Sequence, residues 1–300
     1  CSVDMERAQP TIFHSVPRLW EKFRLGILSK MPEHELDALL RDPFRAKAAR
    51  TWVREVLGLQ HTRFAVSGSA PLPPTLFDWY RLIGLELLEG LGMSEDFAYS
   101  HVSRYGRARI GYVGTPLHGV ERRVADNGEL LIRSPARMLG YYKAPELSAE
   151  AFTDDGFFKT GDRAEVDEQG RLRLTGRLKE LFKTSKGKYV SPAPIESQLL
   201  HLKVEAVCVA GANLGQPFAL MMLNQEARRA LSDTAARSAF ETELESLMAR
   251  VNETLDPHEN LDFLVLVRES WTIANGFLTP TMKIKRNVIE KHYEPKVDGW

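Results

Sequence analysis

Apolar and polar positions in the first third of the chain follow two different periods. Short apolar runs at residues 64–66 and 85–89 predict buried strands, and each run is followed by a loop of small residues. Between them, residues 75–83 have a helical pattern that Gly84 ends. This order predicts a unit of two parallel strands joined by a helix. The two loops at the strand ends would then form a crevice for a ligand.

Two further stretches have the period of half-buried strands around a tight turn. Residues 120–125 and 129–133 flank the pair Asn127-Gly128, which is a strong hairpin signal. A second turn is predicted at residues 167–170, where a glycine supplies the left-handed conformation before an alternating strand. We therefore expect residues 1–178 to be α/β, with βαβ units followed by β-hairpins.

The remainder of the chain has the pattern of a small α+β domain, predicted for residues 179–300. Strands are expected at residues 205–210, 218–223 and 262–267. Residues 234–255 have an apolar stripe at helical spacing, which indicates an amphipathic helix that packs on a core.

Composition narrows the class of protein. A length of 300 residues is enough for about two domains. The 40 basic side chains balance the 40 acidic ones, so no global field favours nucleic acid. Cys1 and Cys208 make no disulfide framework, and no apolar run approaches the ~20 residues that span a bilayer. A cytoplasmic protein is expected, with peripheral association at a membrane left open.

Four motifs, taken in order, carry a family resemblance. They are Thr-Gly-Asp at 160–162, Thr-Gly-Arg-Leu-Lys-Glu at 175–180, Gly-Lys-Tyr-Val-Ser-Pro-Ala-Pro-Ile-Glu at 187–196, and Leu-Thr-Pro-Thr-Met-Lys-Ile-Lys-Arg at 278–286. The first three resemble the adenylate-forming superfamily of acyl-CoA synthetases, luciferases and peptide-synthetase adenylation domains. The last resembles its long-chain fatty acyl-CoA synthetase branch.

The resemblance implies a nucleotide site built from both loops of the βαβ unit. The residues that would border the adenine are Gly68, Ser69, Ala70, Gly90, Leu91, Gly92 and Met93. Asp162 is expected to lie in the loop before the second hairpin. By the same resemblance, it would bind the ribose hydroxyls of ATP and Arg177 would lie near the ribose and phosphates, roles that suit a carboxylate and a guanidinium. Leu91 stands where the family usually has a tyrosine stacked on the base, so we expect weaker stacking.

The resemblance also implies catalytic residues. Ser94 would contact phosphate, Glu95 would be the Mg²⁺ ligand, and Lys283 would be the catalytic lysine that bridges the carboxylate and the α-phosphate. Lys179 would be the hinge of the small domain, and Gly187 would line the tunnel for the pantetheine arm of CoA.

Three other residues near these motifs carry expectations of their own. Arg286 is expected to be solvated or near a CoA phosphate. Tyr141 and Tyr142 are expected to pack in the core.

The implied reaction is ATP-dependent activation of a fatty acid to acyl-AMP, followed by transfer to CoA, with ATP, Mg²⁺ and CoA required. The family's upstream phosphate loop does not occur in this sequence. We therefore expect the C-terminal part of a longer enzyme that is inactive alone. The alternatives are a fatty acyl-AMP ligase, an adenylation domain that loads a carrier protein, and a non-catalytic fragment that binds nucleotide or a partner protein.

Overall fold

The computed structural model describes residues 2–201, 203–231, 233–280 and 282–299, so Cys1 lies outside it. The described chain divides into two compact units, Cys1–Thr175 (unit 1) and Gly176–Trp300 (unit 2). Unit 1 contains two sheets and unit 2 contains a three-stranded sheet and a two-stranded ribbon. This mixed architecture confirms the predicted α/β class followed by a smaller α+β part.

The first sheet of unit 1 holds the predicted parallel strands. Its order is β1 (Ile12–Ser15), β2 (Phe64–Ser67), β3 (Leu87–Leu91), β4 (His101–Val102) and β5 (Thr115–Pro116). The first three strands run parallel, and β4 and β5 are antiparallel additions at one edge. The predicted strand–loop–helix–strand unit is therefore confirmed.

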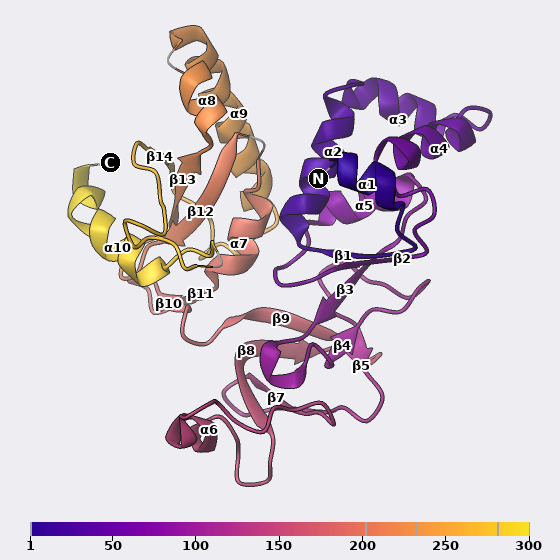
Figure 1. Ribbon diagram of the computed structural model, residues 1–300. Coiled ribbons are helices and arrows are strands. Elements are labelled where there is room, and N and C mark those ends of the chain that lie inside the picture. The colour runs from indigo at the N-terminus through magenta and orange to yellow at the C-terminus, as the bar shows by residue number, and fades with distance from the viewer. Residues whose placement is uncertain (1, 202, 232, 281, 300) are drawn as a thin grey trace. The chain divides into compact units, whose positions relative to one another are not determined.

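Helices gather on one side of this sheet (Figure 1). They are α1 (Ser2–Ala8), α2 (Pro17–Leu28), α3 (Glu33–Arg41), α4 (Ala46–Val56) and α5 (Pro74–Leu82). Their apolar faces meet the sheet in one core that contains Trp20, Leu36, Val53, Phe77 and Leu87. Burial of these large side chains is the main force that holds the parallel strands in place.

The second sheet of unit 1 is antiparallel and consists of the two predicted hairpins. Its order is β6 (Glu121–Val124), β7 (Glu129–Arg133), β8 (Phe158–Val166) and β9 (Leu172–Arg177), with α6 (Pro145–Glu150) between β7 and β8. Both turns close as expected. Gly128 N donates to the Ala125 carbonyl at 2.8 Å, and Gly170 N donates to the Asp167 carbonyl at 2.9 Å.

Unit 2 is built around β12 (Val204–Ala210), β13 (Phe218–Leu223) and β14 (Leu264–Val267). The ribbon of β10 (Phe182–Lys183) and β11 (Tyr189–Val190) precedes them. The helices are α7 (Pro192–Gln198), α8 (Gln225–Ala230), α9 (Thr234–Asn252) and α10 (Arg286–Tyr293), and a 3-10 turn follows at Glu294–Gly299.

The central strand of unit 2 is apolar at every position because both of its faces are covered. Alternate residues, such as Met221, pack with Phe240 and Leu244 of α9. The intervening residues, such as Leu220, pack with Ile289 of α10. A strand buried on both faces carries a continuous apolar run instead of an alternating one.

Candidate functional site

The two predicted loops leave neighbouring strands at the same edge of the parallel sheet. In the register of β2 against β3, Ser67 lies opposite Glu89. A Cβ atom added to Gly68 would lie 3.5 Å from the carbonyl oxygen of Gly90, so the loops approach each other through backbone. Gly90 and Leu91 still belong to β3, and the second loop therefore begins later than expected.

The second loop folds back tightly on itself. A Cβ atom at Gly92 would lie 2.4 Å from the Cα atom of Ala98, so this position requires glycine. Ala98 N donates to the Met93 carbonyl, and Met93 N donates to Oδ1 of Asp96, both at 2.9 Å. The Asp96 side chain is buried, and burial raises its pKa. Asp96 therefore closes the loop from inside.

The 3-10 turn of this loop presents two of the predicted catalytic residues. Ser94 is exposed and Glu95 is half-buried. The hydroxyl group of Tyr141 donates to Oε1 of Glu95 at 3.0 Å. Burial raises the pKa of Tyr141, and the hydrogen bond to Glu95 raises it further.

The expectation that Tyr141 and Tyr142 pack in the core was wrong. Tyr141 is 38% exposed and Tyr142 is 88% exposed. The aromatic character of the pair suggested a core position, but a tyrosine hydroxyl needs a polar partner. Tyr141 finds that partner in Glu95, across 46 residues of sequence.

Apolar side chains of the second loop join it to the antiparallel sheet. Leu91 and Met93 are partly buried against a core formed by residues such as Leu130, Ala164 and Leu172. The side chain of Leu91 is therefore at least partly used in packing within unit 1. Its predicted contact with adenine stays a prediction.

Asp162 lies in the middle of β8, which corrects the expectation of a loop before the hairpin. Thr160 accounts for the difference, because its hydroxyl donates to the Leu130 carbonyl at 2.7 Å and accepts from Asp162 N at 3.1 Å. Asp162 is buried on the same face of β8 as Ala164. That face is the one against which the second loop packs.

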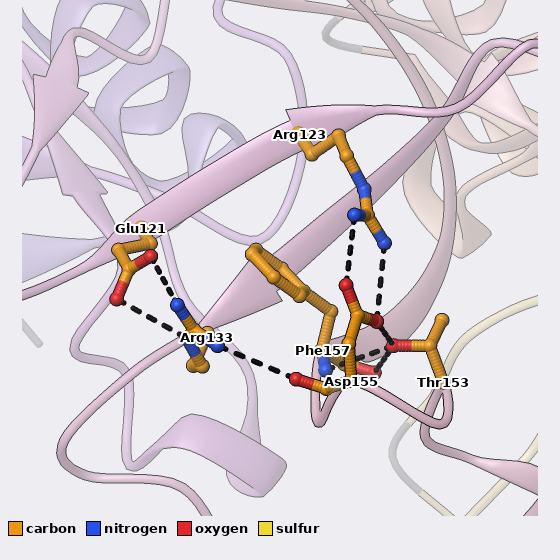
Figure 2. A network of polar contacts seen from close by, with 6 residues as sticks. All are labelled: Glu121, Arg123, Arg133, Thr153, Asp155 and Phe157. Carbon is orange, nitrogen blue, oxygen red and sulfur yellow. Dashed lines mark hydrogen bonds and ion pairs between the residues drawn. The ribbon is translucent and has the colours of Figure 1, made fainter.

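A polar network precedes the strand that carries Asp162 (Figure 2). Arg123 pairs with Asp155 at 2.8 Å, and the guanidinium groups of Arg123 and Arg133 lie 4.6 Å and 4.7 Å from the ring centre of Phe157. Hydrogen bonds from Arg123 and Thr153 lower the pKa of Asp155 to about 2. The network therefore ties the approach to β8 to the first hairpin.

Sequence reasoning missed Glu89, which is buried in the middle of β3. Leu72 N donates to its Oε1 at 3.3 Å, and Gly111 N donates to its Oε2 at 3.2 Å. Burial raises the pKa of Glu89 to about 7, although both hydrogen bonds act in the opposite direction. The available signal was a carboxylate that ends an apolar run directly before a glycine loop.

The residues predicted to act beyond the hairpin lie in unit 2. Arg177 ends β9 and is exposed, as is Lys179 two residues later. Gly187 forms the turn between β10 and β11, where its N–H donates to the Thr184 carbonyl at 2.9 Å. Its φ of +73° favours glycine, and an added Cβ atom would meet nothing within 4 Å. The position is therefore open, as a passage beside the backbone requires.

Lys283 sits on a small turn that holds its backbone while the side chain is exposed. Thr279 N donates to the Lys283 carbonyl at 2.8 Å, and Lys283 N donates to Oγ1 of Thr279 at 3.1 Å. Leu278 and Ile284 form an antiparallel bridge around the turn. Thr281, within the same motif, lies outside the described residues.

Arg286 is not solvated, which corrects the expectation for it. Its guanidinium donates to both carboxylate oxygens of Glu196, at 2.7 Å and 2.9 Å, and to the Val209 carbonyl at 2.7 Å. Burial by itself lowers the pKa of Arg286, but the charge of Glu196 outweighs it and the pKa is raised. A planar fork of donors suits this largely buried two-point contact.

Within the described ranges, no group of three or more His, Cys, Asp or Glu side chains could hold a metal ion. A hollow beside α4 is lined by Arg50 and Arg54, but these donate to the carbonyls of Leu82 and Leu59 and so stabilise helix ends. No helix in the described part of the chain is both long and apolar enough to span a bilayer.

Comparisons with known proteins agree with the geometry of unit 1. A family model described as AMP-binding enzyme matches residues 1–142. The chain is 36% identical to the long-chain-fatty-acid–CoA ligase FadD15 of Mycobacterium bovis, over 82% of this chain and 43% of that protein. It is 28% identical to long-chain-fatty-acid–CoA ligase 1 of Cavia porcellus, over 98% of this chain and 48% of that protein. The chain thus spans about half the length of these curated relatives.

Solved structures share the fold. The adenylation domain of a carboxylate reductase from Mycobacterium chelonae matches with a TM-score of 0.74 at 23% identity, covering 99% of this chain and 47% of that chain. The equivalent domain from Segniliparus rugosus was solved with AMP and a co-purified carboxylic acid. It matches with a TM-score of 0.73 at 26% identity, covering 99% of this chain and 48% of that chain.

Proposed function

Because the chain belongs to the AMP-binding enzyme family and corresponds to part of such an enzyme, we propose that it supplies half of an active site that activates a fatty acid with ATP and transfers the acyl group to CoA. One observation carries the proposal: two glycine loops meet at the carboxyl ends of β2 and β3, and the second presents Glu95 on its turn. The names of the curated relatives support a fatty acid as the substrate.

The proposed nucleotide site lies in unit 1. The loops would border the adenine, where glycine allows close backbone packing of Gly68 near Gly90 and of Gly92 against Ala98. Asp162 would accept hydrogen bonds from the ribose hydroxyls. This role is supported by its buried position on the face of β8 against which the second loop packs. Ser94 is exposed, as a phosphate contact requires.

Glu95 fits a magnesium ion, because it offers a half-buried carboxylate on an anchored turn. Mg²⁺ commonly takes one or two carboxylates and completes its shell with water and substrate phosphates, so a single glutamate is sufficient. When bound, the ion would neutralise charge on the phosphates. Glu95 itself would contribute one negative charge to the metal site.

Unit 2 would supply different residues to the active site in each of the two half-reactions. In the first, the fatty acid carboxylate attacks the α-phosphorus, and acyl-AMP and pyrophosphate form while the ammonium group of Lys283 neutralises charge on both reactants. In the second, the CoA thiol attacks the acyl carbon and AMP leaves. We propose domains 1–178 and 179–300, Lys179 as their hinge, Gly187 beside the pantetheine arm, and Arg177 near the phosphates.

Binding of a non-hydrolysable fatty-acyl-adenylate analogue, measured by calorimetry, tests the nucleotide site. Asp162→Ala should weaken binding about 10- to 100-fold, because two hydrogen bonds to a charged group are lost. Asp126→Ala, an exposed aspartate in the first hairpin turn, is the matched control and should bind as the unaltered chain does. Equal binding by the Asp162 variant would reject its role.

Activity distinguishes the remaining alternatives. We expect the 300-residue chain alone to form little or no acyl-CoA, so robust CoA-dependent AMP formation by it would contradict the proposal. In the longer enzyme, product analysis with CoA and with a carrier protein identifies the acceptor thiol. Acyl transfer to the carrier protein alone would favour the carrier-loading alternative.

A further inference from the structure

We infer that Tyr141 is a positioning residue for Glu95 and holds its carboxylate for a divalent cation, an inference that rests on the proposed function. The hydroxyl group of Tyr141 donates to Oε1 of Glu95 at 3.0 Å. A carboxylate oxygen carries two lone pairs, so this bond leaves Oε2 and part of Oε1 open to a cation. Groups that orient a metal ligand by a hydrogen bond commonly tune the affinity of the site for the metal.

The contact is one of three hydrogen bonds that join the segment of Tyr141 to the loop of Glu95. Ser134 Oγ donates to the Tyr99 carbonyl at 3.0 Å. Met138 N donates to the carbonyl of Glu95 at 2.6 Å. With the tyrosine hydroxyl, these bonds hold both the backbone and the side chain of Glu95.

Tyr141 is itself fixed from the opposite side. Its N–H donates to Oγ of Ser148 on α6 at 2.8 Å, and that hydroxyl donates to the Ala144 carbonyl at 2.8 Å. A rigid chain of contacts therefore runs from α6 through Tyr141 to Glu95. Without it, a half-buried glutamate with three rotatable bonds would sample several rotamers, and cation binding would have to order them.

The adjacent tyrosine provides a matched control. Tyr142 is 88% exposed, and its described contact is with the ammonium group of Lys143, 5.2 Å from the ring centre. Tyr141→Phe and Tyr142→Phe remove the same hydroxyl group from neighbouring positions. If the inference is right, the first substitution changes cation binding and the second does not.

The test uses Mn²⁺ with a non-hydrolysable ATP analogue, and it reads the paramagnetic broadening of amide signals from residues 92–99. The unaltered chain and Tyr142→Phe should show the same loop-centred broadening with the same Mn²⁺ midpoint. Tyr141→Phe should require about tenfold more Mn²⁺. Glu95→Gln should abolish the effect. An unchanged midpoint in Tyr141→Phe would overturn the inference and leave Glu95 as a ligand.

The outcomes separate the inference from the proposed function. Loop-centred broadening that survives in Glu95→Gln, or that is absent from the unaltered chain, would reject the metal role of Glu95 and the inference with it. Amide hydrogen exchange without metal provides the second readout. Tyr141→Phe should keep the protection of Met138 and Ala98, and loss of protection across the loop would overturn positioning in favour of a structural role.

Discussion

Each unit contains a glutamate largely shielded from solvent beside a proposed functional segment, and the two are stabilised differently. In unit 1, the carboxylate of Glu89 accepts from the backbone N–H groups of Leu72 and Gly111. In unit 2, the carboxylate of Glu196 accepts two hydrogen bonds from the Arg286 guanidinium and one from Val209 N at 2.8 Å. The carboxylate of Glu89 is satisfied by backbone dipoles alone, whereas that of Glu196 also has a full positive charge as its partner.

The difference teaches where each unit is sensitive. A buried carboxylate held by backbone dipoles still prefers to be neutral, and the pKa of Glu89 accordingly rises to about 7. A buried ion pair keeps its charge, but removal of one partner leaves the other charge uncompensated. Unit 1 should therefore respond to pH at this position, and unit 2 should respond to substitution.

The largest effect is expected for Arg286→Met, which keeps the side-chain volume and removes the charge. The largely buried Glu196 would be left without its cation, and such losses cost about 3–5 kcal/mol of folding free energy. The measurement is the denaturant dependence of amide hydrogen exchange in β12, which reports on unit 2. Arg250→Met, at an exposed position of α9, should change it little.

A second substitution sharpens this prediction. Adding Glu196→Gln to Arg286→Met removes the uncompensated charge, so the double variant should recover part of the lost stability. If the double variant is as unstable as the single one, the loss comes from packing of the guanidinium, and the contrast with Glu89 fails.

An intermediate effect is expected from the pH dependence of Glu89. The folded pKa of about 7 exceeds the usual value of 4.5, so the folded state binds the proton more tightly. The contribution of Glu89 to the stability of unit 1 should be fully present below about pH 4.5 and should fall by up to about 3 kcal/mol as the pH rises to 7. His101 on the adjacent strand stays neutral in this range, because burial lowers its pKa to about 3.

Glu89→Gln isolates that dependence. The amide cannot accept on both sides, so the variant should lose about 1 kcal/mol at low pH. It should lack the decline above pH 4.5 and become the more stable protein near pH 8. Hydrogen exchange in β2 and β3 at pH 5 and pH 8 measures the crossing, and parallel pH profiles for the two proteins would refute the assignment.

The smallest effect is expected at Asp155, where the ion pair with Arg123 is exposed and solvent screens it. The pKa of about 2 lies below the usual 3.8, so its contribution is present above about pH 4 and is lost as the pH falls through 2. Asp155→Asn should lower the thermal midpoint slightly at pH 7 and not at pH 2. A loss larger than that of the Glu89 variant would be inconsistent with a screened surface pair.

Local signals in the sequence predicted much of the fold. The Asn127-Gly128 pair and the turn ending in Gly170 form hairpins because glycine supplies the backbone conformation that each turn requires. Asp162 was misplaced because a Thr-Gly pair reads as a loop. Strand β8 continues through this pair because the hydroxyl of Thr160 donates a hydrogen bond to Leu130 of the neighbouring strand. No local pattern in the sequence reveals that contact.

Among the candidate site residues, sequence order indicated which loops meet, and the structure brings Gly68 and Gly90 together. The partners of charged and hydroxyl groups could not be predicted. Glu95 and Tyr141 are 46 residues apart, and Arg286 and Glu196 are 90 residues apart. A side chain's polarity is local information, but whether it finds water or a partner depends on elements that only folding brings together.

The sequence by itself determined the types of element, their order and the family to which the chain belongs, because turns, helix ends and motif residues act through their nearest neighbours. Only the tertiary structure decided the ionisation of Glu89, the ion pair that largely shields Arg286 from solvent, and the exposure of Tyr142. Burial and charge pairing arise from segments distant in sequence, and they set the free energy of each charge through the surroundings that the fold creates.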